Sequence, residues 1–567
     1  MNTEKLMYEW NTIPWKKLEV KVFKLQKRIY RASERGDVQT VRKLQKLLLK
    51  SRSAKLLAVK KVTQDNRGKA TAGIDGIKNL TPVKRLKLAS ELKLPKKAQP
   101  IRRVYIPKPG KKEKRPLGIP TMQDRATQAL AKLALEPEWE ARFEPHAYGF
   151  RPGRSTHDAV KYIFNCISRT DKYVLDADIS KCFDKINHQT LLNKINTFPT
   201  MRKAIKAWLK AGVMEGKKIF PTEEGIPQGG IISPLLANIA LHGLEEYVKS
   251  FFPTKKKVGD KKNVTWKPLI VRYADDLLIM HRNLEELRRA KKYAQEWLNN
   301  MGLEFNQSKT RIVHTYQKLD GKEPGFEFLG CSFKQYKLGK RNRRTVAGQY
   351  YSRDAEFKTI ITPTKEAIKR HKNQLGKIID SLKTATEEKL INILNPVISG
   401  WANYYSRVNS SETFSDIDNW LYIKLRRWAK RRHPMKPMGW IANKYWHIDT
   451  KHKWDFSVRD LSLKEHRKVN IKMHVAVKDK RSPFDGDWSY WSTRRKDLPG
   501  TRPVLKNLLH TQKGRCQECN LYFKQEDIIE VHHIDGNHLN RRYSNIEALH
   551  GHCHDNKHRG TLSKPTF

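Results

Sequence analysis

Residues 268–281, with the sequence PLIVRYADDLLIMH, constrain the fold more than any other stretch of the chain. Two apolar runs flank Asp275 and Asp276, which places adjacent acids inside what otherwise reads as buried sheet. Because successive side chains of a strand point to opposite faces, the acids can share a site only at a tight hairpin turn. Two such carboxylates repel by about 4 kcal/mol at an effective dielectric of about 20, so keeping both ionised requires a cation, most simply Mg²⁺. A hairpin tip with solvent-exposed acids is the alternative.

The charge of the chain predicts a polyanionic partner. Lys and Arg number 114 against 58 Asp and Glu, a net charge of +56 that is spread along the whole sequence. Neutralising phosphates releases counterions, so a long RNA or DNA that touches several domains fits best. A mean hydropathy of −0.73, no apolar run long enough to span a bilayer and no signal-peptide core at the N-terminus predict a protein that does not enter membranes.

The length of 567 residues predicts about three to four domains. Six cysteines divide into three scattered residues and a C-terminal group, Cys516, Cys519 and Cys553. This pattern suits a reducing compartment and a metal site better than a disulfide framework.

Residues 1–50 predict two basic amphipathic helices, the second capped by Asp37 and carrying Val38 on its apolar stripe.

Two stretches in the first third of the chain could contact nucleotides. Residues 102–125 predict a strand hairpin with Lys108 and Arg115 at its tip, which suits a triphosphate or template backbone, or equally a solvated loop. Residues 143–155, FEPHAYGFRPGRS, alternate aromatic, Gly and Arg residues as a strand-and-loop surface able to stack and clamp nucleotides.

Two further stretches supply polar groups to the same region. Residues 173–188 predict a strand with Asp176 and Asp178 on one face. The glycine-rich loop GIPQGG precedes an apolar helix, so its backbone can approach a ligand that Gln228 and Ser233 can hydrogen-bond.

The region after residue 360 reads as a helical domain. Thr362 and Pro363 predict an N-cap and a first helical residue. Trp401, Tyr404 and Tyr405 suit a core better than a stacking surface for RNA. In the phrase LYIKLRRWAKRR, aromatic and basic residues interleave, and its candidates for RNA contact are Lys424, Arg426, Arg427 and Arg431.

The last sixty residues predict a metal-binding module. Cys516 and Cys519 pair by spacing with His550 and Cys553, a three-Cys, one-His set that suits structural Zn²⁺. A zinc module that binds DNA without cutting it is one alternative for this stretch.

The order of motifs resembles the reverse transcriptase family, specifically the proteins encoded by group II introns. The phrases GIDG, RPLGIPTMQDR, AYGFRPGRSTHDA, DADISKCFDKINH, GIPQGGIISPLLANI, YADD, GLEFNQSKT and FEFLG occur in sequence, and LNPVISGWANYY follows. The resemblance implies an α+β multidomain protein. Its parts would be right-hand fingers and palm with an antiparallel sheet, an all-α thumb or maturase region, a small DNA-binding region and a zinc-containing ββα-metal HNH domain.

The resemblance also implies roles for single residues of the polymerase. Asp178, Asp275 and Asp276 match the three catalytic acids, the first two bridging a pair of Mg²⁺ ions. Phe183 matches the aromatic residue that rejects a ribose 2′-OH. The remaining matches concern the nucleotide: Gln228 in the binding loop, Lys309 as general acid for the leaving pyrophosphate and, more loosely, the basic fingers positions Arg103, Lys108 and Arg115.

The C-terminal histidines resemble the HNH nuclease motif. His533 would activate water and Asn545 would orient the loop. A divalent metal, Mg²⁺ or Mn²⁺, would be held by His532, His554 and His558. The adjacent histidines and Asn545 favour cleavage over binding alone, because a zinc knuckle has no use for them.

The expected domains follow this resemblance. They are N-terminal helices and a fingers extension (1–85), fingers and palm (86–345), thumb (346–440), a DNA-binding region with a linker (441–505) and the HNH domain (506–567).

The expected function is multiple: RNA-directed DNA polymerisation primed at the target, intron RNA splicing as a maturase, and nicking of a DNA strand for retrohoming. The expected partners are intron RNA in a ribonucleoprotein, double-stranded target DNA and dNTPs, without a membrane. The expected location is the bacterial cytoplasm, on the nucleoid when DNA is bound, or an organelle. The alternative is a non-catalytic RNA-binding splicing factor on a polymerase scaffold. A retron or retrotransposon polymerase would lack both the LNPVISGWANYY region and the HNH tail.

Overall fold

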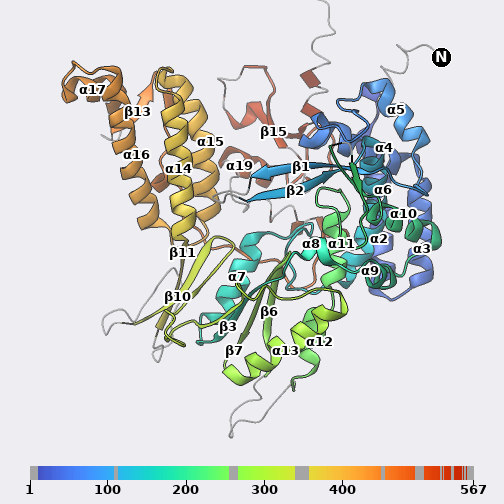
Figure 1. Cartoon of the computed structure of the whole chain (residues 1–567). Helices are drawn as coiled ribbons and strands as arrows, with labels where there is room; N and C mark the ends of the chain where they lie inside the picture. Colours follow the sequence, from blue (N-terminus) through green and yellow to red (C-terminus); the bar gives the residue numbers. More distant parts are fainter. Residues whose placement is uncertain are drawn as a thin grey trace, which may run out of the picture.

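The chain folds as a mixed α+β protein in the computed structural model (Figure 1). Fingers and palm sheets lie between N-terminal helices on one side and thumb helices on the other. The structure describes residues 10–107, 113–216, 218–253, 266–338, 357–448, 454–488, 490, 491, 494, 503–523, 527, 529–537, 540, 542–551, 553, 554, 557 and 558. Among these, no helix combines the length and apolar character needed to cross a bilayer.

Three N-terminal helices, α2 (Trp15–Glu34), α3 (Val38–Lys50) and α4 (Arg52–Lys60), pack around the long central helix α6 (Met122–Arg142). A fourth helix, α5 (Pro82–Glu91), packs mainly on α4. The predicted cap of α3 is confirmed, since Asp37 accepts a hydrogen bond from the Thr40 amide at 2.9 Å. Val38 is 45% exposed, contrary to its place on the predicted stripe, and the buried residues of α3 begin at Val41.

The fingers sheet confirms the predicted hairpin. Strands β1 (Ile101–Pro107) and β2 (Lys114–Ile119) pair antiparallel, with Arg103 opposite Gly118. The sheet order is β2-β1-β4-β5, where β4 is Val213–Glu215 and β5 is Lys218–Phe220. Lys108 lies outside the described residues.

The palm is a four-stranded sheet in the order β6-β7-β3-β8. Its strands are β6 (Leu269–Tyr273), β7 (Asp276–His281), β3 (Tyr173–Asp178) and β8 (Arg311–His314). Alternate side chains enter two cores: one face packs on α7 (Thr156–Ile167) and the other on α13 (Leu284–Asn300). Short helices join the sheet to the fingers: α8 (Cys182–Lys185), α9 (His188–Ile195), α10 (Pro199–Leu209), α11 (Ser233–Leu241) and α12 (Leu244–Ser250).

The predicted start of the first thumb helix is wrong by two residues. Thr362 and Pro363 end strand β11 (Phe357–Pro363), which pairs with β10 (Cys331–Lys337) beside β9 (Phe326–Phe328). The helix α14 is Lys365–Ser381, and its cap is Thr364, whose hydroxyl accepts from the Ala367 amide. Sheet pairing prevailed over the local Thr-Pro signal because all seven residues of β11 find register partners on β10.

Three long helices form the thumb: α14, α15 (Glu387–Tyr405) and α16 (Ser411–Arg432). They continue into α17 (Met438–Tyr445) and a small sheet of β12 (Trp446–Ile448), β13 (Trp454–Val458) and β14 (Leu461–Ser462). The expected packing role of the aromatic trio is confirmed: Tyr405 is buried, and Trp401 and Tyr404 pack against the same core. Both tyrosine hydroxyls donate to backbone carbonyls at the β9–β10 turn, which joins thumb to palm.

The chain after the thumb returns to the palm before the C-terminal module. Asp158, at the start of α7, accepts hydrogen bonds from His474, the Val477 amide and Arg494. These bonds hold the segment between η3 (His466–Lys468) and residue 494 against α7. The module beyond it contains α19 (Pro503–Thr511) and the antiparallel strands β15 (Ile529–His533) and β16 (Ile546–His550).

Candidate active sites

The adjacent acids occupy the tight hairpin turn that their sequence required. Tyr273 pairs with Asp276, so Ala274 and Asp275 form the two-residue turn between β6 and β7. Ala274 adopts a φ of +56° to close it. Asp276 also stands directly opposite Asp178, the last residue of β3. Three acids from two segments nearly a hundred residues apart therefore meet at one edge of the palm sheet.

This acidic edge is electrostatically strained in the absence of a cation. Burial raises the pKa of Asp275, and the nearby Asp178 adds to the rise. Burial, then Asp275 and Asp178, raises the pKa of Asp276 to about 7. Lys309 donates a hydrogen bond from Nζ to Asp178 Oδ2 at 2.6 Å, and this bond raises the pKa of Lys309. Clustered, half-buried carboxylate oxygens are the donors that Mg²⁺ prefers, so the residues fit such ions.

The glycine-rich loop and Phe183 lie beside this edge. Gln228 contacts Asp184 through Nε2 at 3.4 Å, and its carbonyl accepts from the Gly118 amide of β2 at 2.6 Å. A Cβ on Gly229, whose φ is +120°, would lie 2.5 Å from the Gly118 carbonyl oxygen. The close approach of the loop to β2 therefore requires glycine at position 229. The Phe183 ring packs edge-on against Phe150 at 6.3 Å.

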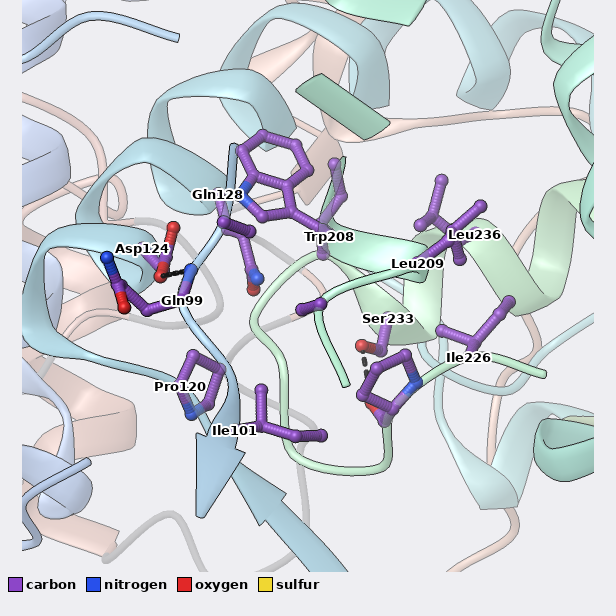
Figure 2. Close-up of a pocket in the computed structure, with 14 residues that line it drawn as sticks. Gln99, Ile101, Pro120, Asp124, Gln128, Trp208, Leu209, Ile226, Ser233 and Leu236 are labelled. Atoms are coloured by element: carbon purple, nitrogen blue, oxygen red, sulfur yellow. Dashed lines mark hydrogen bonds between the residues drawn. The ribbon is translucent and has the colours of Figure 1, made fainter. Parts of the chain in front are cut away.

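Ser233 does not face a ligand, contrary to the sequence expectation. Figure 2 shows its hydroxyl directed at the loop, where it donates to the Pro227 carbonyl at 2.7 Å. The side chain is buried and lines a void of about 10 Å³ together with residues such as Gln128 and Trp208. Ser233 therefore holds the loop over the start of α11, because the loop folds back across that helix end.

The expected nucleotide clamps in residues 143–155 are also structural. The Arg151 side chain is fully buried, and its guanidinium donates two hydrogen bonds, of 2.9 and 3.0 Å, to the Glu140 carboxylate. Arg154 is buried too, and it donates to the carbonyls of Pro145 and Asp479. Phe150 remains 48% exposed beside Phe183. A motif rich in Arg and Gly does not reveal which guanidinium groups turn inward.

Replacing Glu140 by alanine is expected to lower the free energy of unfolding by about 3–5 kcal/mol, because Arg151 would keep a buried charge without its partner. Denaturant unfolding of the purified protein measures the change. The exposed Glu296 on α13 offers the control: Glu296→Ala should change stability by about 0.5 kcal/mol or less. Equal effects of the two substitutions would contradict the assigned role of the pair.

The basic candidates divide by their surroundings. Arg115 is exposed on β2. Burial is the largest cause of the raised pKa of Asp275, and the positive charge of Arg115 partly offsets that rise. The fingers hairpin therefore reaches the acids. Arg103 is half-buried within β1. On α16, Lys424 contacts Asp380 at 2.9 Å. Exposed side chains on the same helix are presented by Arg426, Arg427 and Arg431.

The C-terminal module contains two clusters of side chains whose types can hold a metal ion. Cys516, Cys519, His550 and Cys553 are buried, and one donor atom from each lies within 4.8 Å of all the others. The donor atoms of His532, His554 and His558 satisfy the same limit in a more exposed position. Three thiols and an imidazole suit tetrahedral Zn²⁺, whereas three imidazoles leave coordination positions open.

Asn545 and His533 lie beside the histidine cluster. The Asn545 side chain donates to Asp535 Oδ1 at 2.8 Å and to the Asn540 carbonyl at 2.9 Å, and it accepts from the Asp535 amide. It thereby shapes the loop between β15 and β16. His533 is the last residue of β15, next to His532.

Four family models match the chain in the order of these regions. "N-terminal domain of reverse transcriptase" matches residues 10–92, and "Reverse transcriptase (RNA-dependent DNA polymerase)" matches 106–333. "Group II intron, maturase-specific domain" matches residues 368–446, and "HNH endonuclease" matches 516–560. Polymerase, maturase and nuclease domains therefore occur in one chain.

Several curated proteins are similar to this chain. Protein YkfC of Escherichia coli K12 is 32% identical over 307 residues, which are 48% of this chain and 77% of YkfC. The group II intron-encoded protein LtrA of Lactococcus lactis is 30% identical over 388 residues, 57% of this chain and 63% of LtrA. Maturase-like protein 1 of Euglena gracilis is 26% identical over 405 residues, 69% of this chain and 76% of its own length.

Proposed function

This chain belongs to the group II intron-encoded proteins, and from that membership we propose how its three kinds of domain work. It combines a reverse transcriptase, a maturase domain and an HNH endonuclease. A non-catalytic splicing factor on a polymerase scaffold is not favoured. The protein copies intron RNA into DNA from a primer in the target, assists splicing of that RNA and nicks the target strand for retrohoming.

The observation that carries the polymerase proposal is the meeting of Asp178, Asp275 and Asp276 at one palm edge. Asp178 and Asp275 would hold two Mg²⁺ ions there, which would supply stabilisation of the negative charge on the attacking and leaving oxygens. Asp276 assists on the primer side, and Lys309, next to Asp178, protonates the leaving pyrophosphate.

Other side chains select and hold the substrates. Phe183 excludes a ribose 2′-OH, and Gln228 orients the incoming dNTP in its loop. The triphosphate is contacted by Arg103, Lys108 and Arg115. Intron RNA binds along α16 through Lys424, Arg426, Arg427 and Arg431. The exposure of the three arginines supports this assignment, and the ion pair of Lys424 with Asp380 makes it the weakest of the set.

The nuclease works through the histidine cluster of the C-terminal module. His532, His554 and His558 would hold a divalent metal, which would polarise the scissile phosphate. His533 activates water, and Asn545 keeps the adjoining loop in place. Cys516, Cys519, His550 and Cys553 bind structural Zn²⁺. The natural partners are intron RNA, double-stranded target DNA and dNTPs. The site of action is the bacterial cytoplasm or an organelle.

The test is primer extension on an RNA template by the purified protein, compared with stimulation of splicing of its intron. Incorporation of dNTPs by the wild-type protein supports the polymerase. Stimulated splicing without any extension would favour the binding-only alternative. The gene's position inside an intron RNA that copurifies with the protein would identify the substrate.

Removing zinc with a strong chelator is expected to unfold the C-terminal module and leave the polymerase core folded. A structural zinc site contributes folding free energy directly, so its loss destabilises the residues around it. Metal analysis and thermal unfolding measure both effects, with Cys519→Ser as the matched variant. A purified protein without zinc, or one whose stability the chelator leaves unchanged, would contradict the zinc assignment.

A further inference from the structure

A buried arginine holds the turn that carries Asp275. Arg272, the fourth residue of β6, is 3% exposed, and its Nη1 donates to the Ala274 carbonyl at 3.2 Å and to Asn238 Oδ1 at 3.0 Å. Its backbone also pairs with the loop before α7: its amide donates to the His146 carbonyl at 3.0 Å, and its carbonyl accepts from the Tyr148 amide at 2.9 Å. Arg272 therefore connects this hairpin to α11 through its guanidinium and to the loop before α7 through its backbone.

Asn238 connects the other ends of this network. It lies on α11, is 2% exposed and donates from Nδ2 to the Gly149 carbonyl at 2.8 Å. One amide group thus binds Arg272 through its oxygen and the 146–149 loop through its nitrogen. A hydrophobic side chain of similar size could fill the space but could make neither bond.

The 146–149 loop touches the turn directly. A Cβ added to Gly149 would lie 2.3 Å from the Ala274 amide nitrogen, so no side chain fits between them. Ala274 itself has a φ of +56°, a conformation that costs about 1–3 kcal/mol for a residue other than glycine and persists only when its surroundings enforce it. The 146–149 loop and the Arg272–Asn238 pair both contact this turn, and together they hold Ala274 in that conformation.

We propose that Asn238 is a positioning residue of the polymerase site, which fixes the Ala274–Asp275 turn by binding Arg272 and the Gly149 carbonyl at once. Asn238 does not touch substrate or metal. It acts on the position of the Asp275 carboxylate, and thus on how well that carboxylate and Asp178 share a cation. The inference rests on the proposed polymerase function and extends it to a residue of the GIPQGGIISPLLANI phrase to which the resemblance assigned no role.

The test compares two substitutions of a buried amide by leucine. Asn238→Leu removes both bonds of the network. Gln45→Leu removes the hydrogen bonds of an amide that is 0% exposed and lies among the N-terminal helices, away from the acids. Each variant is measured for kcat and for the dNTP KM in primer extension, for melting temperature, and for Mn²⁺ binding without substrate. Mn²⁺ binding at the polymerase site is identified as the part of the total Mn²⁺ binding that is lost in the variant Asp275→Asn.

Asn238→Leu is expected to lower kcat by about 10- to 100-fold, the usual cost of a small misplacement of a reacting group. The dNTP KM should stay within about twofold, since no nucleotide contact is lost. Mn²⁺ binding at the acidic edge should weaken about tenfold. Gln45→Leu should lower the melting temperature and leave kcat and Mn²⁺ binding unchanged.

Two outcomes would overturn the proposal: Asn238→Leu behaving like Gln45→Leu, or both variants losing kcat and Mn²⁺ binding equally. If Asn238→Leu does not fold, Asn238→Asp decides, because it retains an acceptor for Arg272 and loses only the donor to Gly149. Its kcat should then fall between those of the wild type and Asp275→Asn, and a wild-type kcat would refute the positioning role. A wild-type protein that binds Mn²⁺ at the acids but extends no primer would refute the polymerase function and leave the Mn²⁺ comparison to decide the role of Asn238.

Discussion

Asp275→Asn is expected to reduce primer extension by about 10³-fold or more. The amide keeps the size of the carboxylate but loses its negative charge, so the acidic edge binds the divalent cation more weakly. Metal stabilisation of the transition state contributes several kcal/mol, and each 1.36 kcal/mol lost costs about tenfold in rate. Because Asp275 occupies the turn and not the sheet interior, the fold should survive the change. Single-turnover extension at saturating dNTP measures the loss.

The matched control is Asp176→Asn on the same palm sheet. Asp176 contacts Arg311 at 3.1 Å, two residues before Asp178 on β3. Its substitution removes one partly exposed ion pair and is expected to leave the extension rate within about a few-fold of wild type. If Asp275→Asn retained extension comparable to that of Asp176→Asn, the acids at the turn would not be the polymerase site. Intron RNA binding should be unchanged in both variants, because neither residue lies on α16.

His533→Ala is expected to reduce DNA nicking by about 10²- to 10⁴-fold, the usual contribution of a general base. His533 ends β15 next to His532, whose imidazole belongs to the metal-binding cluster. Removing His533 would delete the proposed acceptor of the proton from water and leave the cluster itself in place. Nicking of a double-stranded target by the ribonucleoprotein measures the effect.

Two controls separate the chemistry from the fold in this experiment. Primer extension by His533→Ala should equal that of the wild type, since the polymerase acids lie in a different domain. Zinc content should also be unchanged, because the Cys516, Cys519, His550 and Cys553 set does not include His533. Undiminished nicking would transfer the role of base to another residue, and simultaneous loss of zinc would indicate that the substitution disrupts the module.

Local patterns in the sequence predicted individual elements well. The fingers hairpin and the hairpin that carries Asp275 follow from turn residues between apolar runs, and the cap of α3 follows from Asp37 after Gly36. The same local rules failed at Thr362 and Pro363, which entered a strand because a partner strand was available. Likewise, Ser233, Arg151 and Arg154 have the composition of ligand-binding residues, yet each is buried and bonded to the protein's own backbone or to Glu140.

The sequence by itself determined which chemistry this protein can perform: paired acids at a turn, a third acid on a nearby strand and Cys/His sets with metal-binding spacing. Only the tertiary structure decided which polar groups serve that chemistry and which hold the fold. A buried polar side chain must find a partner, and that partner generally lies far away in sequence, as Asn238 does from Gly149 and Arg272. Residue type and spacing carry no record of such distant pairings, so the support behind Asp275 emerges only once the chain has folded.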